Sequence, residues 1–180
     1  DSAAAGGITG KATGCISSSA NYGQISSANY AGGLAGHTTG WEIPAVKNSY
    51  NRGHVSSDNT AGGLAGYAQN IELYNCYNAG EVSGSQKGAV AGNFNISINN
   101  SADRTYYIND ADAFGNQSQV KGHEYVTVTG KTADSMKGSA FAAALNKSAK
   151  GMFTGKTGDF PVLSHIEKKI VYTVSYTGDY

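Results

Sequence analysis

A six-residue phrase that occurs twice constrains the fold of this 180-residue chain more than any other feature. The phrase Ala-Gly-Gly-Leu-Ala-Gly stands at residues 31–36 and again at 61–66, and looser copies begin at Gly6 and Gly88. Successive copies are 26, 30 and 26 residues apart. A period of this length is typical of a solenoid, in which each repeat is stable only when it is stacked on its neighbours.

A second phrase alternates with the first along the first hundred residues. It has the form Asn-x-Gly-x-Ile/Val-Ser and begins at Asn21, Asn51 and Asn78. Between the phrases, Ile, Val, Leu and Tyr alternate with Ser, Asn and Thr, and Gly marks the corners, which is a strand pattern. The sequence therefore predicts a mainly β protein, a parallel β-helix of about four coils over residues 1–108, with a C-terminal α-helical cap.

Aligning the repeats predicts which side chains stack on one another inside the solenoid. The paired glycines suit corners that need a positive φ or a close approach between coils. The asparagines are expected to form a corner ladder, with amides bonding from coil to coil or tolerating left-handed φ, rather than a ligand site. Three apolar ladders are predicted: Ile8, Leu34, Leu64 and Val90; Ile25, Val55 and Val82; and Ile16, Val46 and Leu73.

Composition narrows the classes of function. The formal net charge is zero and only 14% of the residues are charged, so no basic field is available to hold nucleic acid or an anionic membrane. The sequence shows neither an apolar run of membrane-spanning length nor a signal peptide, and it starts and stops within the pattern, as an excised or processed fragment would. Cys15 and Cys76 lie two repeats apart, roughly 9–10 Å in a solenoid, which is too far for a disulfide. Both are expected to be buried thiols.

One coil carries an insertion between the first and second phrases. It includes His37, Trp41 and Glu42, and Trp41 is the only tryptophan. Insertions in repeat arrays often fall on the binding face, so these residues either form a recognition patch or fold back over a coil edge. Tyr67 is a further candidate, because tyrosine on a charge-poor surface suits contacts with sugars or proteins. Tyrosine also simply fits strands, and Tyr22, Tyr30, Tyr67 and Tyr74 stand at different positions of the repeat.

The two phrases together resemble the GLUG repeat of bacterial cell-surface proteins. The resemblance rests on Gly-Gly-Leu-Ala-Gly followed by Asn-Cys-Tyr-Asn-Ala-Gly-Glu-Val-Ser at 75–83, and it covers residues 5–108. The chain departs from the repeat at Gly88-Ala89-Val90, which lacks the double glycine, and at Ser49, where cysteine is usual. The resemblance implies a secreted, adhesin-like region of a larger protein and supplies no catalytic residue.

Residues 109–165 are expected to hold the final coil and the helical cap. The run 109–112, Asn-Asp-Ala-Asp, does not fit an EF-hand loop, so a solvated turn is favoured over a calcium site. A helix is predicted to start near Thr132 or Asp134, with an apolar face of Met136, Ala140, Phe141, Ala144 and Leu145 that covers the open end of the array. This stretch resembles the tail that follows such repeats in Gram-positive surface proteins, through Met136, Leu145-Asn146, Phe153 and Pro161-Val162-Leu163.

Residues 166–180 alternate as a strand, which either leads to a following domain or is appended to the edge of a sheet. For the chain as a whole we expect no catalysis, no metal and no cofactor. The histidines stand at no metal-ligand spacing. Glu72 and Glu81 share a coil, but Asp58 lies at a different repeat position, so no pair of acids builds up across coils. The predicted function is a non-catalytic extracellular module that binds host glycan or protein. The alternatives are a structural spacer without a ligand and, less favoured, a β-helix enzyme acting on polysaccharide.

Overall fold

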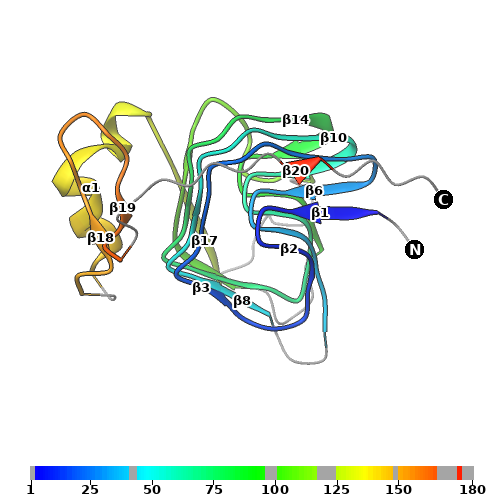
Figure 1. Cartoon of the computed structure of the whole chain (residues 1–180), viewed down its shortest axis with the longest axis horizontal. Helices are drawn as coiled ribbons and strands as arrows, with labels where there is room; N and C mark the ends of the chain where they lie inside the picture. Colours follow the sequence, from blue (N-terminus) through cyan, green and yellow to red (C-terminus); the bar gives the residue numbers. More distant parts are fainter. Residues whose placement is uncertain are drawn as a thin grey trace.

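The computed structural model describes the chain as a parallel β-solenoid with one short helix beside it (Figure 1). The chain is mainly β and makes about four turns, which confirms the predicted fold class. The structure describes residues 3–40, 44–95, 101–116, 125–147, 150–165 and 174–175.

Three parallel sheets form the solenoid. The first contains β1 (Ala4–Gly6), β5 (Ile25–Ser27), β6 (Tyr30–Gly32), β10 (Val55–Gly62), β14 (Val82–Gly88) and β20 (Val174–Ser175). The second contains β2 (Thr9–Ala12), β7 (Ala35–Thr38), β11 (Ala65–Gln69) and β15 (Ala91–Asn95). The third contains β3 (Ile16–Ser17), β4 (Ala20–Asn21), β8 (Ala45–Lys47), β9 (Tyr50–Asn51), β12 (Glu72–Tyr74), β13 (Tyr77–Asn78), β16 (Ser101–Ile108) and β17 (Val126–Lys131).

The first sheet projects from the solenoid as a fin. In each coil an outgoing arm (residues 55–57 of β10) is followed by a returning arm (residues 60–62 of β10). The first half of β10 pairs with β5 and its second half pairs with β6, with a register shift between Ser57 and Thr60 where the strand bends. Side chains from the two arms meet, because Val55 from the outgoing arm and Ala61 from the returning arm belong to one buried cluster. After the returning arm, the chain turns at the Gly-Gly phrase into the second sheet.

The register of the sheets confirms the three predicted ladders. The N–H of Leu34 donates to the Leu64 carbonyl, and that of Leu64 donates to the Val90 carbonyl. Strand pairing also aligns Val55 with Ile25 and Val82, and Val46 with Ile16 and Leu73. Leu34, Leu64 and Val90 are fully buried, whereas Ile8 is 46% exposed because it belongs to the first coil, below which the described chain stacks no further copy.

The double glycine is required by close approach rather than by positive φ, which none of the phrase glycines adopts. A Cβ on Gly33 would lie 2.1 Å from the carbonyl oxygen of Gly63 and 2.4 Å from Cγ of Asn51. Since real Cβ atoms do not approach other atoms so closely, the second glycine of each phrase lies directly against the asparagine of the other phrase. The two phrases alternate along the chain because they pack against each other in every coil.

The three asparagines form the predicted ladder. Nδ2 of Asn21 donates to Oδ1 of Asn51 at 2.8 Å, and Nδ2 of Asn51 donates to Oδ1 of Asn78 at 2.9 Å. Each amide also binds its own corner, donating to the carbonyl of the glycine two residues on and accepting from that glycine's N–H. The central amide, that of Asn51, therefore makes four hydrogen bonds while fully buried.

The helical segment follows the solenoid and packs on its side. It contains a 3-10 turn at Asp134–Met136, α1 (Gly138–Leu145), and an antiparallel pair of β18 (Phe153–Thr154) and β19 (Val162–Leu163). The predicted helix is therefore present but begins later, at Gly138, whose positive φ of 79° separates it from the 3-10 turn. Ala140 is exposed, contrary to prediction, and Ala142 is buried in its place.

The prediction that this helix covers the open end of the array is wrong. Tyr50 and Tyr77 point outward from successive coils and stack with ring centroids 4.8 Å apart, and they belong to one buried cluster with Met136, Phe141 and Leu145. The helix therefore lies against the third sheet, as Figure 1 shows at the left. The physical reason is that this row of tyrosines already forms an apolar stripe along the side of the solenoid.

Polar contacts fix the helical segment to the solenoid. The hydroxyl of Tyr77 donates to the carbonyl of Pro161, and burial raises the pKa of this tyrosine well above its ordinary value. Arg52 forms an ion pair with Asp159 at 2.8 Å and lies over the ring of Phe160. Within the segment, the side-chain amide of Asn146 exchanges two hydrogen bonds of 2.7 Å with the backbone of Phe153.

The two cysteines are free thiols in different surroundings. Cys76 is buried as predicted, its Sγ lies 3.3 Å from the Val46 carbonyl oxygen, and burial raises its pKa to about 12. Cys15 is exposed, so the prediction that both are buried is wrong for this residue. Cys15 lies in the exposed turn before β3, whose first residue, Ile16, faces the core.

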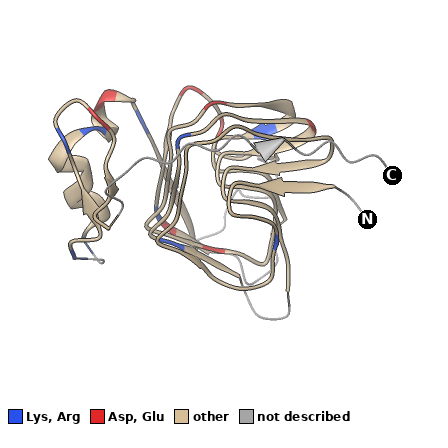
Figure 2. Cartoon of the chain, viewed as in Figure 1, with Lys and Arg blue, Asp and Glu red and all other residues tan. Residues whose placement is uncertain are grey.

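The strand near the C-terminus is appended to a sheet edge at the two residues that the structure describes there. Val174 pairs with Ile25 and Ser175 pairs with Ser26, in parallel. Figure 2 shows acidic and basic residues scattered over the coils and the helical segment, without a field of one sign. Across the described ranges, no helix has the length and apolar character needed to cross a membrane.

Candidate ligand-binding surface

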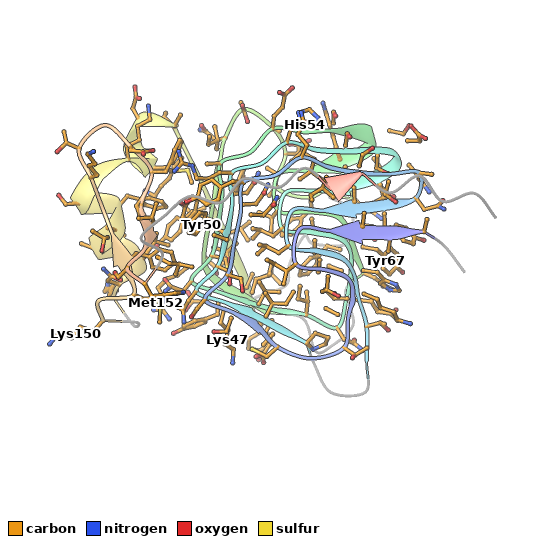
Figure 3. The ribbon with its side chains drawn as sticks, in the orientation of Figure 1. Lys47, Tyr50, His54, Tyr67, Lys150 and Met152 are labelled. Atoms are coloured by element: carbon orange, nitrogen blue, oxygen red, sulfur yellow. The ribbon has the colours of Figure 1, made fainter. Side chains whose placement is uncertain are left out.

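The outward face of the second sheet carries one side chain per coil at the same height. Strand pairing places Lys11 beside His37, His37 beside Tyr67, and Tyr67 beside Asn93. The residues that follow His37 and Tyr67 face the core: Thr38 and Ala68 are fully buried. Strand alternation therefore holds the column on the surface, at the right of the molecule in Figure 3, on the side opposite to Tyr50 and Met152.

A tyrosine from the fin completes an aromatic cluster over this column. The ring of Tyr30, at the start of β6, lies 5.8 Å from that of His37 and 5.3 Å from that of Tyr67. The His37 and Tyr67 rings lie 5.0 Å apart, nearly perpendicular to each other. We call these three residues the aromatic patch. All three side chains are partly exposed, so part of the surface of the aromatic patch is accessible to a ligand.

Polar groups border the aromatic patch. Nδ2 of Asn95 donates to the hydroxyl of Tyr67 at 3.2 Å. Nε2 of His37 is buried and has no hydrogen-bond partner among the described residues. Burial and then the positive charge of Lys11 lower the pKa of His37, while a hydrogen bond with Gln69 partly offsets them. With its pKa below 6.5, His37 is largely neutral at pH 7, so its ring adds little formal charge to the aromatic patch.

Two of the four predicted binding residues lie in this patch, and their binding role stays a prediction. The structure brings His37 and Tyr67 together, whereas Trp41 and Glu42 lie outside the described residues. Tyr30 was not predicted. It stands at a different position of the repeat from Tyr67, so aligning the repeats gave no sign of the contact, which arises because the fin folds back toward the second sheet.

The acids considered for catalysis are separated in the structure. Glu72 lies on β12 of the third sheet, between Ala45 and Ser101. Glu81 precedes β14 at the fin and lies 3.6 Å from the imidazole of His54. In the portions of the chain that the structure describes, no group of three or more His, Cys, Asp or Glu is arranged to hold a metal ion.

The pKa of His37 yields a test of the patch geometry. Since the folded pKa lies below the ordinary value of 6.5, the unfolded chain binds more protons between these two values, and stability falls as pH drops through that window. An NMR titration should give a midpoint for His37 below 6.5. The free energy of unfolding should decrease from pH 7 to pH 5, and His37→Gln should remove part of that decrease. A midpoint at or above 6.5 would contradict the buried, Lys11-facing position.

Comparison with known proteins supports the repeat and the fold. Residues 57–83 match the model of a family described as Glug, the GLUG motif. This span holds the second complete Ala-Gly-Gly-Leu-Ala-Gly phrase and the asparagine phrase that follows it, so the resemblance seen in the sequence is confirmed for this repeat. No curated protein matches the chain.

Among solved structures, the chain is similar to one described as a "putative immunoglobulin A1 protease from Bacteroides ovatus". The TM-score is 0.67 with 20% sequence identity, over 90% of this chain and 53% of that one. The chain thus spans about half the length of that protein. A likeness at this identity shows the shared β-helix fold alone.

Proposed function

We propose that this chain is a non-catalytic binding module of a secreted bacterial surface protein, and that it takes a host glycan or protein on the aromatic patch. The observation that carries the proposal is the gathering of Tyr30, His37 and Tyr67 on one face. Aromatic rings bordered by amides and a neutral imidazole suit sugar rings and peptide side chains, because they offer apolar area together with directional hydrogen bonds.

The alternative is a spacer that holds other domains of a larger chain and has no ligand. A spacer needs only the stacked coils and would place its surface aromatics singly. The tyrosines of the third sheet are consistent with a spacer, because the helical segment covers Tyr50 and Tyr77 completely and leaves them unavailable to a ligand. The aromatic patch has no such cover among the described residues, and this difference favours the binding module.

An enzymatic role has less support. The structural neighbour is named as a protease, and that name speaks only for that protein. Glu72 lies on β12 of the third sheet and Glu81 lies before β14 at the fin, where it faces His54, so the two do not form the pair of carboxylates that polysaccharide cleavage requires. Turnover of any member of a panel of polysaccharides or proteins by the purified chain would contradict the non-catalytic part of the proposal.

The binding test combines a glycan array with pull-down from host extracellular proteins. Tyr67→Ala should weaken the captured interaction at least about tenfold, since an aromatic side chain at the centre of an interface contributes about 2 kcal/mol or more. Tyr67→Phe separates the ring from the hydroxyl that binds Asn95. Trp41→Ala tests the adjoining predicted residue.

The matched control is Tyr125→Ala. Tyr125 is 67% exposed and has no ring contact with the aromatic patch, so its removal should leave binding unchanged. Thermal unfolding of every variant confirms that the fold is intact. Absence of enrichment on both the array and the pull-down would overturn the binding module in favour of the spacer, and equal losses in Tyr67→Ala and Tyr125→Ala would overturn the location.

A further inference from the structure

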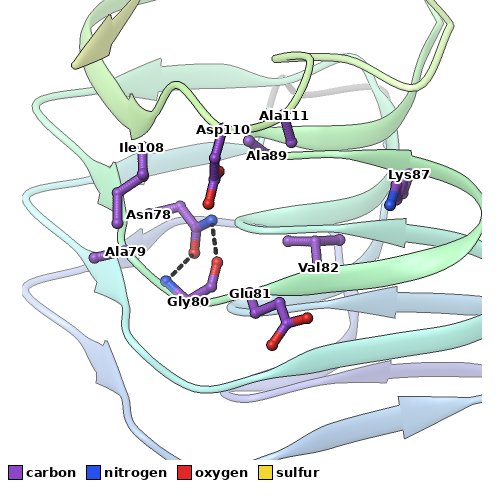
Figure 4. A pocket seen from close by; sticks show the side chains of 10 residues that line it. All are labelled: Asn78, Ala79, Gly80, Glu81, Val82, Lys87, Ala89, Ile108, Asp110 and Ala111. Atoms are coloured by element: carbon purple, nitrogen blue, oxygen red, sulfur yellow. Dashed lines mark hydrogen bonds between the residues drawn. The ribbon is translucent and has the colours of Figure 1, made fainter. Parts of the chain in front are cut away.

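A hollow lies beside β14, at the end of the solenoid that the later coils form (Figure 4). Its volume is about 380 Å³, within the range of about 300–1,000 Å³ for ligand pockets. One wall is formed by residues 78–82, at the corner and outgoing arm of the third coil. The rest is formed by Lys87 and Ala89 and by residues 108–111, which cross above them. The lining residues are Asn78, Ala79, Gly80, Glu81, Val82, Lys87, Ala89, Ile108, Asp110 and Ala111.

The asparagine ladder is unfinished at this hollow. In Asn21 and Asn51, Nδ2 donates both to the glycine of its own corner and to the next asparagine. Nδ2 of Asn78 donates to the Gly80 carbonyl at 2.9 Å, and no further acceptor for it lies among the described residues. The position that pairs with Asn78 in the next coil is Tyr107. Asn78 is only 2% exposed, and one N–H of its amide is left without an acceptor among the described residues because a tyrosine stands where the next asparagine would lie.

The strand edge beside this amide is open as well. In the lower coils, the N–H of Ile25 donates to the His54 carbonyl and that of Val55 donates to the Glu81 carbonyl, each to the coil above. The matching residue of the third coil is Val82, and within the described chain β10 is the one strand that pairs with β14. The N–H and carbonyl that Val82 directs away from β10 thus face the hollow's side of the sheet.

This space is not filled by the chain itself, because the fourth copy of the repeat lacks a Gly-x-Val-Ser segment. After β16 the backbone crosses directly to the returning arm, where the N–H of Ala89 donates to the Asp112 carbonyl. In the lower coils the equivalent space is filled, since Ile25, Ala31, Val55 and Ala61 form the buried core of the fin. At the top, Val82 is only partly buried, and Lys87 replaces the alanine of the returning arm.

The opposite edge of the same sheet has an additional strand, β20, paired to it. There, Val174 and Ser175 pair in parallel with Ile25 and Ser26, although they lie about 150 residues away in the sequence. This separate strand repeats the Val-Ser pair of Val55-Ser56 and Val82-Ser83. The sheet therefore takes an added strand in the register of its own repeats, which is a general mode of peptide recognition.

We propose that the hollow binds an extended peptide from a separate chain, added as a parallel strand along Val82–Gly84. A Val or Ile of the peptide covers Val82, which is only partly buried. The carboxylates of Glu81 and Asp110 against the single ammonium of Lys87 favour a peptide with a basic residue beside that Val or Ile. This proposal is independent of the aromatic patch.

The probe is the acetylated and amidated pentapeptide Gly-His-Val-Ser-Ser, which copies residues 53–57. Its binding to the full chain is measured by fluorescence anisotropy of a labelled form. We expect saturable binding that weakens at least about tenfold when the peptide's Val is replaced by Asp, because the change places a charge against the apolar side chain of Val82. This control peptide needs no change in the protein.

Two protein variants locate the site. Val82→Asp places a charge under the peptide and should weaken binding at least about tenfold, whereas Ile8→Asp makes the same apolar-to-acid change at the opposite end of the array and should leave it unchanged. On binding, the backbone amide of Val82 should gain protection from hydrogen exchange. The proposal is overturned if the pentapeptide shows no saturable binding, if the control peptide binds as well as the probe, or if Ile8→Asp weakens binding as much as Val82→Asp.

Discussion

Gly63→Ala is expected to destabilise the protein by at least about 3 kcal/mol or to prevent folding, the upper range for overpacking a core. A Cβ at this position would lie 2.1 Å from the carbonyl oxygen of Ala89 and 2.4 Å from both Cγ and Nδ2 of Asn78. Both are held in place, the first as backbone and the second by the ladder, so neither can move without separating two coils. Urea unfolding followed by circular dichroism measures the effect.

Gly14→Ala is the matched control for this substitution. Nothing lies within 4 Å of a Cβ at Gly14, and its backbone is not in the left-handed region. The same chemical change there should leave stability unchanged or raise it by about 0.4–1 kcal/mol, through the lower entropy of the unfolded chain. If Gly63→Ala were as mild as Gly14→Ala, the close packing of the glycine phrase against the asparagine ladder would be wrong.

Asn51→Leu is expected to cost on the order of 4 kcal/mol. The substitution leaves Nδ2 of Asn21 without one of its two acceptors and Oδ1 of Asn78 without one of its donors, and it frees both backbone groups of Gly53. A buried polar group left unpaired costs about 1–3 kcal/mol, and at least two are created here. Thermal unfolding should show a fall of about 8–16 °C in Tm for a chain of this length.

Asn59→Leu is the control for this second experiment. Asn59 is exposed at the bend of the fin, and its side chain takes part in a single contact of 3.4 Å with the Thr60 hydroxyl. Its replacement should change stability by no more than about 0.5 kcal/mol. A small effect of Asn51→Leu, similar to that of Asn59→Leu, would show that the ladder contributes little to holding the coils together.

The solenoid could be predicted from the sequence because stacking places equivalent residues of successive repeats on top of one another. Aligning the copies at Leu34 and Leu64, or at Asn51 and Asn78, is therefore the same operation as building the ladder. The alignment also indicated where the helix packs. Tyr50 and Tyr77 share one repeat position, and a repeated outward tyrosine forms a stripe that needs cover.

Contacts between different positions of the repeat could not be predicted in this way. Tyr30 meets Tyr67 because the fin bends back at Ser57–Thr60 in the coil above and at the matching point below, and an alignment does not encode that bend. The unfinished rung at Asn78 had a visible cause, the absence of Gly-x-Val-Ser after Tyr107. The hollow that results depends on the backbone crossing directly to Ala89, and an alignment of the repeats does not encode that crossing.

Hydrogen exchange of the asparagine side-chain amides, followed by NMR, tests most directly the claim that the repeats encode a buried ladder with an open last rung. The amides of Asn21 and Asn51 donate twice within the protein, whereas that of Asn78 donates once and faces the hollow. We predict that the first two exchange at least about tenfold more slowly than the third, the factor given by about 1.4 kcal/mol of additional protection. Equal rates for all three, or exchange of Asn51 as fast as that of a solvent-exposed amide, would contradict the account.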